Sequence, residues 1–394
     1  MKYIALKDVF SIKKGKKVEQ VEFKNDHTVR YIQIDDLRNN SQVKYCNKEE
    51  NYVYVDPNDI VIAWDGANAG TVGYGLDGAI GSTLAKLEVK TEELFVPFVA
   101  LYLQSKFNYF QSTATGATIP HISRNALESI GIPLISLEKQ KEIFNVLKKT
   151  QNTIEKRQSQ IAALDELTQS VFFKMFQDKK DFSKVSIEQV VESIEAGWSV
   201  SGEERAKEEK EIAVLKISAV TKGYFNDNEY KVLNPNIEIK KAVYPQKGDI
   251  LFSRANTREL VGASAIVPKD YKDLILPDKL WKINLRKGII TPEYFHTVIN
   301  TKKVRNEFSK NATGTSGSML NISMQKFKRV EINLPSIEKQ QLFSAKFIQI
   351  QQMKQKLISS KEEMNVLYNS LLQKAFKGEL FQEWKLNESV SQRS

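Results

Sequence analysis

The sequence predicts a mixed α/β (α+β) fold made of two similar units, each closed by a long helix. Short motifs recur in register, because Ile122-Ser123 returns as Ile322-Ser323 and segment 137–140 returns as 337–340. Apolar, β-branched runs precede both copies, and long amphipathic stretches follow them. The offset of 200 residues holds through to Phe176 and Phe376, which indicates a duplicated unit rather than chance. The chain therefore carries a pseudo-two-fold internal repeat.

The length of 394 residues fits two domains with connecting elements. We assign residues 1–136 to a first domain and residues 137–178 to a first long helix. Residues 179–336 form a second domain, and residues 337–394 form a second long helix with a C-terminal tail.

Strands in the first block are predicted from apolar patterning. Residues 30–34 alternate as a half-buried strand does, and residues 59–64 contain a continuous apolar run typical of a buried strand. The small polar segment 65–70 predicts a loop. Residues 95–107 have helical spacing after a polar Thr-Glu-Glu start.

The second block follows the same order. Residues 212–217 match the first strand, residues 248–253 match the buried strand, and the loop 254–260 matches the loop after it. We pair Val72-Gly73 with Val261-Gly262, an offset of about 189 against about 181 near the N-terminus. The second block therefore carries insertions, as expected if the loops set different specificities.

Each block ends in a helix whose apolar residues follow the 3-4 spacing of a coiled coil. Thr150 and Arg157 interrupt the first seam, and Lys354 and Lys361 interrupt the second at matching depths. Because the seams share length and phase, we expect the helices to pair antiparallel; the alternative is that each packs on its own sheet. Gly378 predicts the C-terminal cap of the second helix. The seam residues are Ile143, Leu147, Ile154, Ile161, Leu164, Val171 and Met175, then Phe343, Phe347, Ile350, Leu357, Met364, Tyr368, Leu371 and Ala375.

The composition favours a polyanionic partner, because the net charge is +10 and the pI is about 9.2. The single cysteine excludes a disulfide framework and a cysteine-built metal site, and the three scattered histidines show no zinc-type spacing. The chain shows no signal-peptide core and no apolar run of about eighteen residues. We expect a cytoplasmic protein without membrane contact.

No catalytic motif is visible. Gly73 to Gly78 match GxGxxG, but the following residues predict a turn and strand instead of the helix that a dinucleotide site needs. The GxxxxGK[ST] loop, a Glu-x-Lys after Pro277-Asp278 and an Asn/Asp-Pro-Pro-aromatic segment are all missing. We therefore expect no catalytic residue, metal or cofactor on this chain, which favours a binding protein over an enzyme.

Polar loops in both blocks are candidates for nucleic-acid binding. Segments 113–124 and 311–323 combine small hydroxyl residues, glycine and backbone N–H groups that suit phosphate oxygens. Arg254, Asn256 and Arg258 share one short loop, and their side chains suit guanine and adenine edges. The alternative is a set of solvated turns with Ser123 and Ser323 as helix N-caps.

These segments resemble a known family. Residues 249–257, the two Thr-Gly…Ile-Ser loops and the paired Leu/Ile-Glu-Lys-Gln helix openings are similar to the specificity (S) subunit of type I restriction–modification systems. The resemblance covers nearly the whole chain. It implies two target recognition domains, similar to those of adenine-N6 methyltransferases, that each recognise half of an interrupted DNA sequence. It also implies that the helices pair antiparallel, set the unread spacer and dock two modification subunits.

The resemblance further implies that S-adenosylmethionine and methyl transfer belong to the modification subunits. ATP-driven translocation and cleavage, with Mg²⁺, belong to restriction subunits. In this alignment Trp64-Asp65-Gly66 stand where Ser253-Arg254-Ala255 stand, and the carboxylate suits cytosine N4. The positions expected to face double-stranded DNA are Trp64, Asp65, Asn68, Thr115, Thr118, His121, Ser123 and Arg124, then Arg254, Asn256, Thr257, Arg258, Thr313, Thr315, Ser316, Ser318 and Asn321.

Three other interpretations stay open. The first is the recognition subunit of a related system with methylation and cleavage on one partner chain. The second is a methyltransferase or nuclease that acts alone, which the missing motifs argue against. The third is a coiled-coil scaffold that does not bind DNA, which predicts no preference for any DNA sequence.

Overall fold

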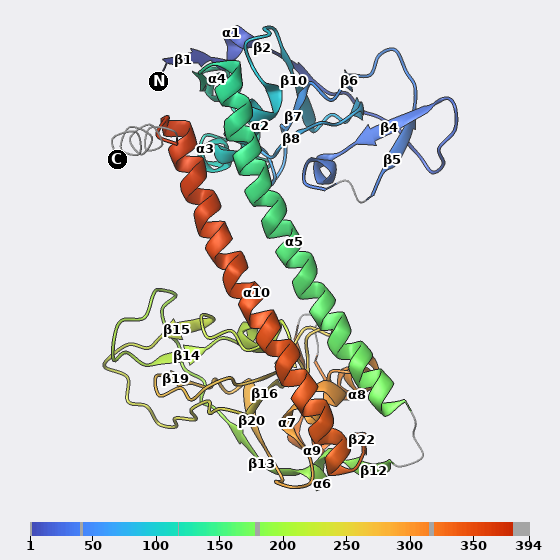
Figure 1. The fold of residues 1–394 in the computed structure, drawn as a ribbon, viewed down its shortest axis with the longest axis vertical. Helices are drawn as coiled ribbons and strands as arrows, with labels where there is room; N and C mark the ends of the chain where they lie inside the picture. The colour runs from blue at the N-terminus through green and yellow to red at the C-terminus, as the bar shows by residue number, and fades with distance from the viewer. Residues whose placement is uncertain (1, 40–41, 117, 178–181, 315–318, 381–394) are drawn as a thin grey trace, which may run out of the picture. The chain divides into compact units, whose positions relative to one another are not determined.

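The computed structural model describes residues 2–39, 42–116, 118–177, 182–314 and 319–380. The chain divides into two compact units (Figure 1). The first unit comprises residues 1–158 and 359–394, and the second comprises residues 159–358. Each unit therefore contains one block of strands, the beginning of one long helix and the end of the other.

The first unit contains three sheets. A two-stranded antiparallel sheet pairs β1 (Lys2–Ala5) with β11 (Gly131–Leu134). A four-stranded sheet has the order β2 (Phe10–Lys14), β10 (Leu84–Val89), β7 (Ile60–Ala63) and β8 (Val72–Tyr74). A five-stranded sheet has the order β3 (Gln20–Val21), β5 (Lys44–Asn47), β4 (Thr28–Ile32), β9 (Gly78–Ile80) and β6 (Tyr54–Val55).

The second unit repeats the two-stranded and four-stranded sheets, and it has a three-stranded sheet in place of the five-stranded one. The pair β12 (Ser183–Ser186) and β22 (Glu331–Leu334) replaces β1 and β11. The four-stranded sheet has the order β13 (Val191–Ala196), β20 (Leu280–Leu285), β16 (Ile250–Ser253) and β18 (Ser264–Ile266). Further strands are β15 (Tyr230–Val232), β14 (Ala213–Leu215) and β19 (Leu274–Ile275) in one sheet, and β17 (Ala255–Asn256) with β21 (Leu320–Asn321).

The short helices follow the strands in the same order in both units. Those of the first unit are α1 (Leu6–Val9), the 3₁₀ helix η1 (Ile34–Leu37), α2 (Val96–Ser105), α3 (Phe107–Ser112) and α4 (Arg124–Glu128). Those of the second are α6 (Ile187–Val190), the 3₁₀ helix η2 (Ile217–Val220), α7 (Pro292–Ile299), α8 (Lys302–Asn311) and α9 (Met324–Lys328). The predicted duplication and mixed α/β class are confirmed.

The predicted pairing of one glycine between the blocks is wrong. Gly262 N donates to Ser253 O as Gly70 N donates to Ala63 O, and both glycines have positive φ and adjoin a phenylalanine ring. Gly262 therefore corresponds to Gly70, not to Gly73. The offset is 190 on β7 and β16 and becomes 192 after the loop. The loop is two residues longer in the second unit, which a single offset of about 189 cannot represent.

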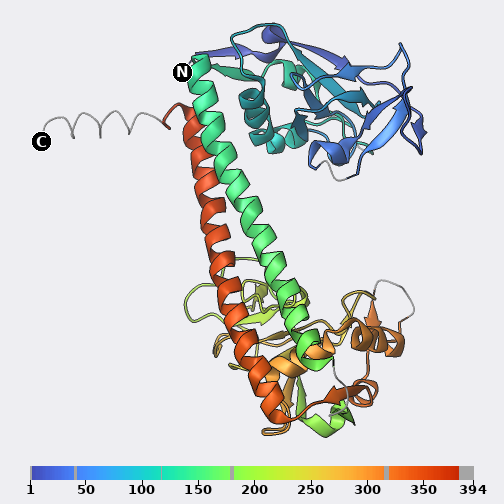
Figure 2. The same cartoon turned by 45° about the vertical axis from the view of Figure 1, so that its right-hand side comes forward.

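The long helices are α5 (Leu137–Phe176, 40 residues) and α10 (Ile337–Lys377, 41 residues) (Figure 2). In the second unit Phe172 of α5 packs on Phe343 of α10, while Asp165 bonds Lys354 Nζ at 2.5 Å, so the two helices run antiparallel there. In the first unit Lys361 Nζ donates to Gln158 Oε1 at 2.6 Å. The expected antiparallel pair is confirmed, and two of the predicted seam interruptions make contacts between the helices.

Gly378 ends α10 as predicted. Its φ of 78° is left-handed, and Glu379 N donates to Lys374 O at 2.8 Å, which is the six-residue bond of a Schellman cap.

Each hydrophobic core combines a block of strands with both long helices. In the first unit Phe376 of α10 packs on Phe98 and Tyr102 of α2. In the second unit Phe176 of α5 packs on Tyr294 of α7 and Phe343 of α10. The predicted seam positions Val171 and Met175 are only partly buried there, because the neighbouring Phe172 and Phe176 take the inner positions.

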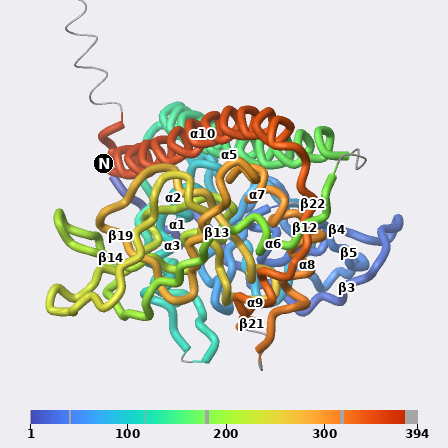
Figure 3. The backbone as a smooth tube through the Cα atoms, turned by 90° about the horizontal axis from the view of Figure 1, so that it is seen from below, coloured from blue at the N-terminus to red at the C-terminus, as the bar shows by residue number. Residues whose placement is uncertain are grey.

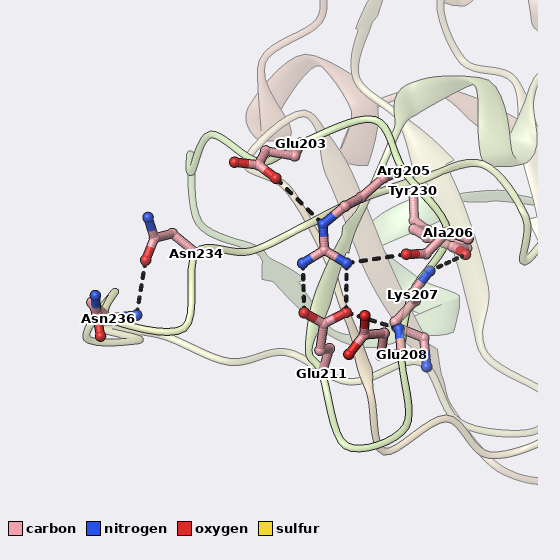
Figure 4. A network of polar contacts seen from close by, with 9 residues as sticks. All are labelled: Glu203, Arg205, Ala206, Lys207, Glu208, Glu211, Tyr230, Asn234 and Asn236. Atoms are coloured by element: carbon pink, nitrogen blue, oxygen red, sulfur yellow. Dashed lines mark hydrogen bonds and ion pairs between the residues drawn. The ribbon is translucent and has the colours of Figure 1, made fainter.

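One polar network shapes the loop before β14 in the second unit (Figure 4). Arg205 pairs with Glu203 and Glu211, and Lys207 N donates to Tyr230 Oη at 3.1 Å. The Arg205 guanidinium lowers the pKa of the Glu211 carboxyl to about 2. This cation is paired with carboxylates of its own loop, and it is therefore not free to contact a polyanion.

Candidate nucleic-acid interface

In the first unit, two loops that are far apart in sequence join into one platform. The loop after β7 meets the loop before α4, because Ile122 N donates to Trp64 O at 2.9 Å and Gly66 N donates to Pro120 O at 2.8 Å. Thr115 and His121 exchange two backbone hydrogen bonds across the second loop. The platform therefore brings together polar residues that the sequence placed in separate segments.

The second unit builds the same platform. Ile322 N donates to Arg254 O at 2.9 Å, and Thr313 and Asn321 exchange two backbone hydrogen bonds of 2.9 Å. The strands β17 and β21 add a short antiparallel ladder between the loops. Figure 3 shows α9, which begins at Met324, next to β21.

These bonds also correct the predicted alignment of the loops. Trp64 O and Arg254 O accept the equivalent bonds from Ile122 and Ile322, so Arg254 corresponds to Trp64. Asp65 corresponds to Ala255. The expectation that Asp65 stands in the place of Arg254 is wrong by one position, because the offset is 190 at the end of these strands rather than 189.

Asp65 is the centre of a polar cluster in the first unit. Its Oδ1 lies 2.6 Å from His121 Nδ1, and its Oδ2 lies 2.8 Å from Lys14 Nζ. Partial burial raises the pKa of Asp65, but the bonds to Lys14 and His121 outweigh it, and the pKa is lowered overall. The carboxylate is therefore ionised at neutral pH, and it is 16% exposed against 46% for the imidazole.

Arg254 is the centre of the cluster in the second unit. Its Nε donates to Asp278 O at 2.9 Å, its Nη2 lies 3.4 Å from Asp278 Oδ2, and its Nη1 donates to Asn321 Oδ1 at 3.1 Å. The guanidinium is planar and donates only, so these bonds fix both its own plane and the orientation of the Asn321 amide.

Three residues of these clusters were not predicted from the sequence. Lys14 lies at the end of β2, Asp278 lies in the turn before β20, and Arg38 donates to Asn68 Oδ1 at 2.8 Å. None lies in a loop singled out by composition. Strand pairing alone brings Lys14 and Asp278 to the platforms, and no spacing of residues in the sequence indicates this proximity.

The serines that open α4 and α9 cap these helices. Ser123 Oγ accepts from Ala126 N and Ser323 Oγ accepts from Lys326 N, both at 3.3 Å. This confirms the capping alternative for both residues. Next to the first cap, Arg124 Nε donates to Glu128 Oε1 at 2.7 Å.

The other predicted positions are distributed over the two platforms. Trp64, Asn256 and Thr257 are half-buried, and Asn256 Oδ1 accepts from Thr257 N at 2.9 Å. Exposed positions are Thr115, Thr118, Arg258, Thr313 and Asn321. Thr315, Ser316 and Ser318 lie outside the described residues.

Gly78 opens strand β9, so the GxGxxG match precedes a strand and does not form a dinucleotide fingerprint. In the described part of the chain, no group of three or more histidine, cysteine, aspartate or glutamate side chains is arranged to hold a metal ion. No described helix contains an apolar stretch of membrane-spanning length.

Comparison with known proteins identifies the family. The model of the type I restriction modification DNA specificity domain matches residues 1–165 and again residues 179–363. The chain belongs to this family. Both copies of the specificity domain match, so the duplication seen in the sheets coincides with a duplicated family domain.

Named relatives of this specificity-domain family span most of the chain. The MjaVIII specificity subunit of Methanocaldococcus jannaschii is 26% identical over 360 residues, covering 86% of this chain and 83% of the relative. The EcoKI specificity subunit of Escherichia coli is 24% identical over 361 residues, covering 84% and 76%. Both are named as specificity subunits of restriction enzymes, which agrees with a recognition subunit that is not itself an enzyme.

One solved structure supports the fold. The S subunit of a type I restriction-modification system from M. genitalium superposes with a TM-score of 0.60 at 17% identity, covering 95% of each chain. At this identity the likeness concerns the fold alone, and it confirms the architecture of two mixed α/β repeats with long helices.

Proposed function

We propose that this chain is the sequence-specific DNA-recognition subunit of a type I restriction–modification complex. Each repeat recognises one half of a bipartite DNA target. The observation that carries the proposal is that the same two-loop platform, with polar side chains at equivalent places, is built once in each unit. A protein that binds one small ligand has no use for two such platforms, whereas a two-part DNA site requires two.

The platforms have the chemistry that duplex DNA requires. Exposed hydroxyl groups and backbone N–H groups suit phosphate oxygens, which position a protein on the duplex. Side chains such as Asn256, Arg258, His121 and Asn321 are able to form hydrogen bonds with base edges. The proposed DNA-facing set remains the one given by the resemblance.

The long helices have a separate role in this proposal. They set the length of the unrecognised spacer and dock two modification subunits, which carry S-adenosylmethionine and methylate adenines. Restriction subunits complete the complex. Support comes from the helices themselves, because each is a single uninterrupted element about 60 Å long at 1.5 Å per residue.

An arginine substitution tests the assignment of one half-site to each repeat. We expect Arg254→Ala to relax the half-site recognised by the second repeat and to leave the other half-site and the spacer unchanged. The matched control is Arg286→Ala, an exposed arginine that follows β20 at the end opposite to Asp278. Methylated sites are scored by sequencing DNA from cells that express each full-length variant with its partner subunits. An equal loss on both half-sites contradicts the assignment.

A further inference from the structure

The two platforms place different side chains at one equivalent position. His121 and Asn321 each precede the isoleucine that bonds to the neighbouring loop, and each exchanges two backbone bonds with a threonine, Thr115 or Thr313. Both side chains are exposed. Any difference between the hydrogen bonds that they offer is therefore a difference in what the two repeats recognise.

Asp65 determines what His121 offers. A carboxylate only accepts, so the 2.6 Å contact requires Nδ1 of His121 to carry the proton. The other ring nitrogen, Nε2, is then an acceptor in the neutral imidazole. Lys14 holds the second oxygen of the same carboxylate, which neutralises its charge and fixes its orientation.

Arg254 determines what Asn321 offers. The guanidinium only donates, so the amide must turn its Oδ1 toward Nη1. The Asn321 NH₂ group is left with its two donors, which bond to no other described residue. The charged partner is thus a carboxylate in one unit and a guanidinium in the other, and the exposed groups have opposite hydrogen-bonding character.

The two ion pairs are built from unrelated positions. On the β10 and β20 strands, the register places Ala196 where Lys14 stands, and Ser82 corresponds to Asp278. Neither charged residue has a charged counterpart in the other repeat. The two repeats therefore use different ion pairs to orient the side chains at this equivalent position.

We infer that Asp65 and Arg254 are positioning residues that set opposite hydrogen-bond polarity at this position. His121 then presents an acceptor to the DNA, and Asn321 presents a donor. An outward acceptor selects a base with an amino group in the major groove, adenine or cytosine, and an outward donor selects a base with a carbonyl group there, guanine or thymine. This inference rests on the proposed function and adds to it a class of base for one position in each half-site.

The most direct test reverses the hydrogen-bonding character of the exposed group at Asn321. Asn321→Asp keeps the shape and the bond to Arg254 but replaces the outward donor with an acceptor oxygen. We expect the preferred base at one position of the second half-site to change from a keto base to an amino base, with a preference change of about tenfold or more. The control Asn234→Asp adds the same charge at a distant turn of the same unit, where Oδ1 caps Asn236 N (Figure 4).

A conservative substitution tests the first polarity. In His121→Asn the amide NH₂ is expected to bond Asp65 and leave its oxygen outward, so the base preference of the first half-site is kept. His121→Ala is expected to lose that preference. The readout is the methylated motif in DNA from cells that express each full-length variant with its partner subunits.

The outcomes separate the inference from the proposed function. A methylated motif whose bases are unchanged by Asn321→Asp overturns the polarity inference and leaves the recognition role intact. If Asn321→Asp gives no methylation, the test rests on the first half-site. An equal loss of base preference in His121→Asn and His121→Ala then overturns the inference. If neither the wild type nor Asn234→Asp directs methylation to any interrupted motif, the proposed function itself fails.

Discussion

Two glutamines show what single side chains contribute to this fold. Gln140 and Gln340 open the long helices and are fully buried. Gln140 Oε1 accepts from Phe95 N at 2.8 Å, while its Nε2 donates to Glu93 O and Ile135 O at 2.9 Å. Gln340 makes the corresponding three bonds. The recurring Leu/Ile-Glu-Lys-Gln motif therefore joins each helix to its block of strands.

We expect Gln340→Leu to lower the free energy of unfolding by about 2 kcal/mol, because it leaves a partly buried backbone N–H group and two carbonyl groups without their partner. Gln352→Leu, at an exposed position of the same helix, is the matched control and is expected to change the free energy by less than about 0.5 kcal/mol. Urea unfolding of the full-length chain measures both. Equal effects of the two substitutions would show that the buried bonds do not stabilise the fold.

A buried histidine makes the stability depend on pH. His296 lies in the second core, where Ser264 Oγ and Asn300 Nδ2 are each 3.2 Å from its Nδ1. Burial, together with the nearby Lys354, lowers the pKa of His296 to about 4 from an ordinary value of 6.5. The unfolded chain therefore binds more protons between these values, and stability that is fully present above about pH 6.5 is lost as the pH falls toward 4.

From this linkage we expect His296 to cost the protein about 1 kcal/mol of stability between pH 7.5 and pH 5.5. The variant His296→Gln lacks the titrating group and should lose correspondingly less over the same interval. Urea unfolding at the two pH values compares them. A pH dependence that is identical in both proteins would rule out His296 as its source.

Single residues could be predicted from the sequence where their role depends only on their neighbours along the chain. We anticipated Ser123 and Ser323 as possible caps and Gly378 as a helix end, because caps depend on adjacent residues. We did not anticipate Lys14 or Asp278, because strand pairing brings them to the platforms from distant segments.

Among the secondary-structure elements, the buried strands and both long helices were predicted from apolar patterning. Their periodicity is local, so the order of residues along the chain is enough to indicate them. The interruptions at Lys354 and Lys361 were also informative, since both residues contact the facing helix. Alignment of the loops was wrong by one to three residues. A loop has no regular apolar pattern in which a two-residue insertion would show as a shift. The backbone hydrogen bonds of the structure were needed to locate the insertion.

Removal of one heptad from each helix, residues 154–160 and 354–360, tests the helices as a ruler. Seven residues span about 10 Å of helix, and base pairs are spaced by about 3.4 Å. We therefore expect the unread spacer to shorten by about three base pairs with both half-sites unchanged. Sequencing of methylated DNA gives the spacer and half-sites together. An altered half-site with an unaltered spacer would refute the ruler.

At the scale of the whole molecule, the compact units do not coincide with the repeats. The end of α10 contributes Phe376 to the first core, and the end of α5 contributes Phe176 to the second. The internal duplication was evident from the sequence because it keeps a constant offset. The exchange of helix ends was not evident from the sequence. The apolar seams are compatible both with helices that pair with each other and with helices that pack on their own sheets, and only the contacts in the structure distinguish the two.

We propose above that this chain selects a bipartite DNA sequence for methylation. It is tested most directly by single-molecule sequencing of native DNA from the source cells, with and without this gene, scored for methylated adenine. We expect an interrupted motif that is methylated in the parent cells and unmethylated in the deletion strain. Methylation that is identical in the two strains, with the chain and its partner subunits expressed in the parent, would contradict it.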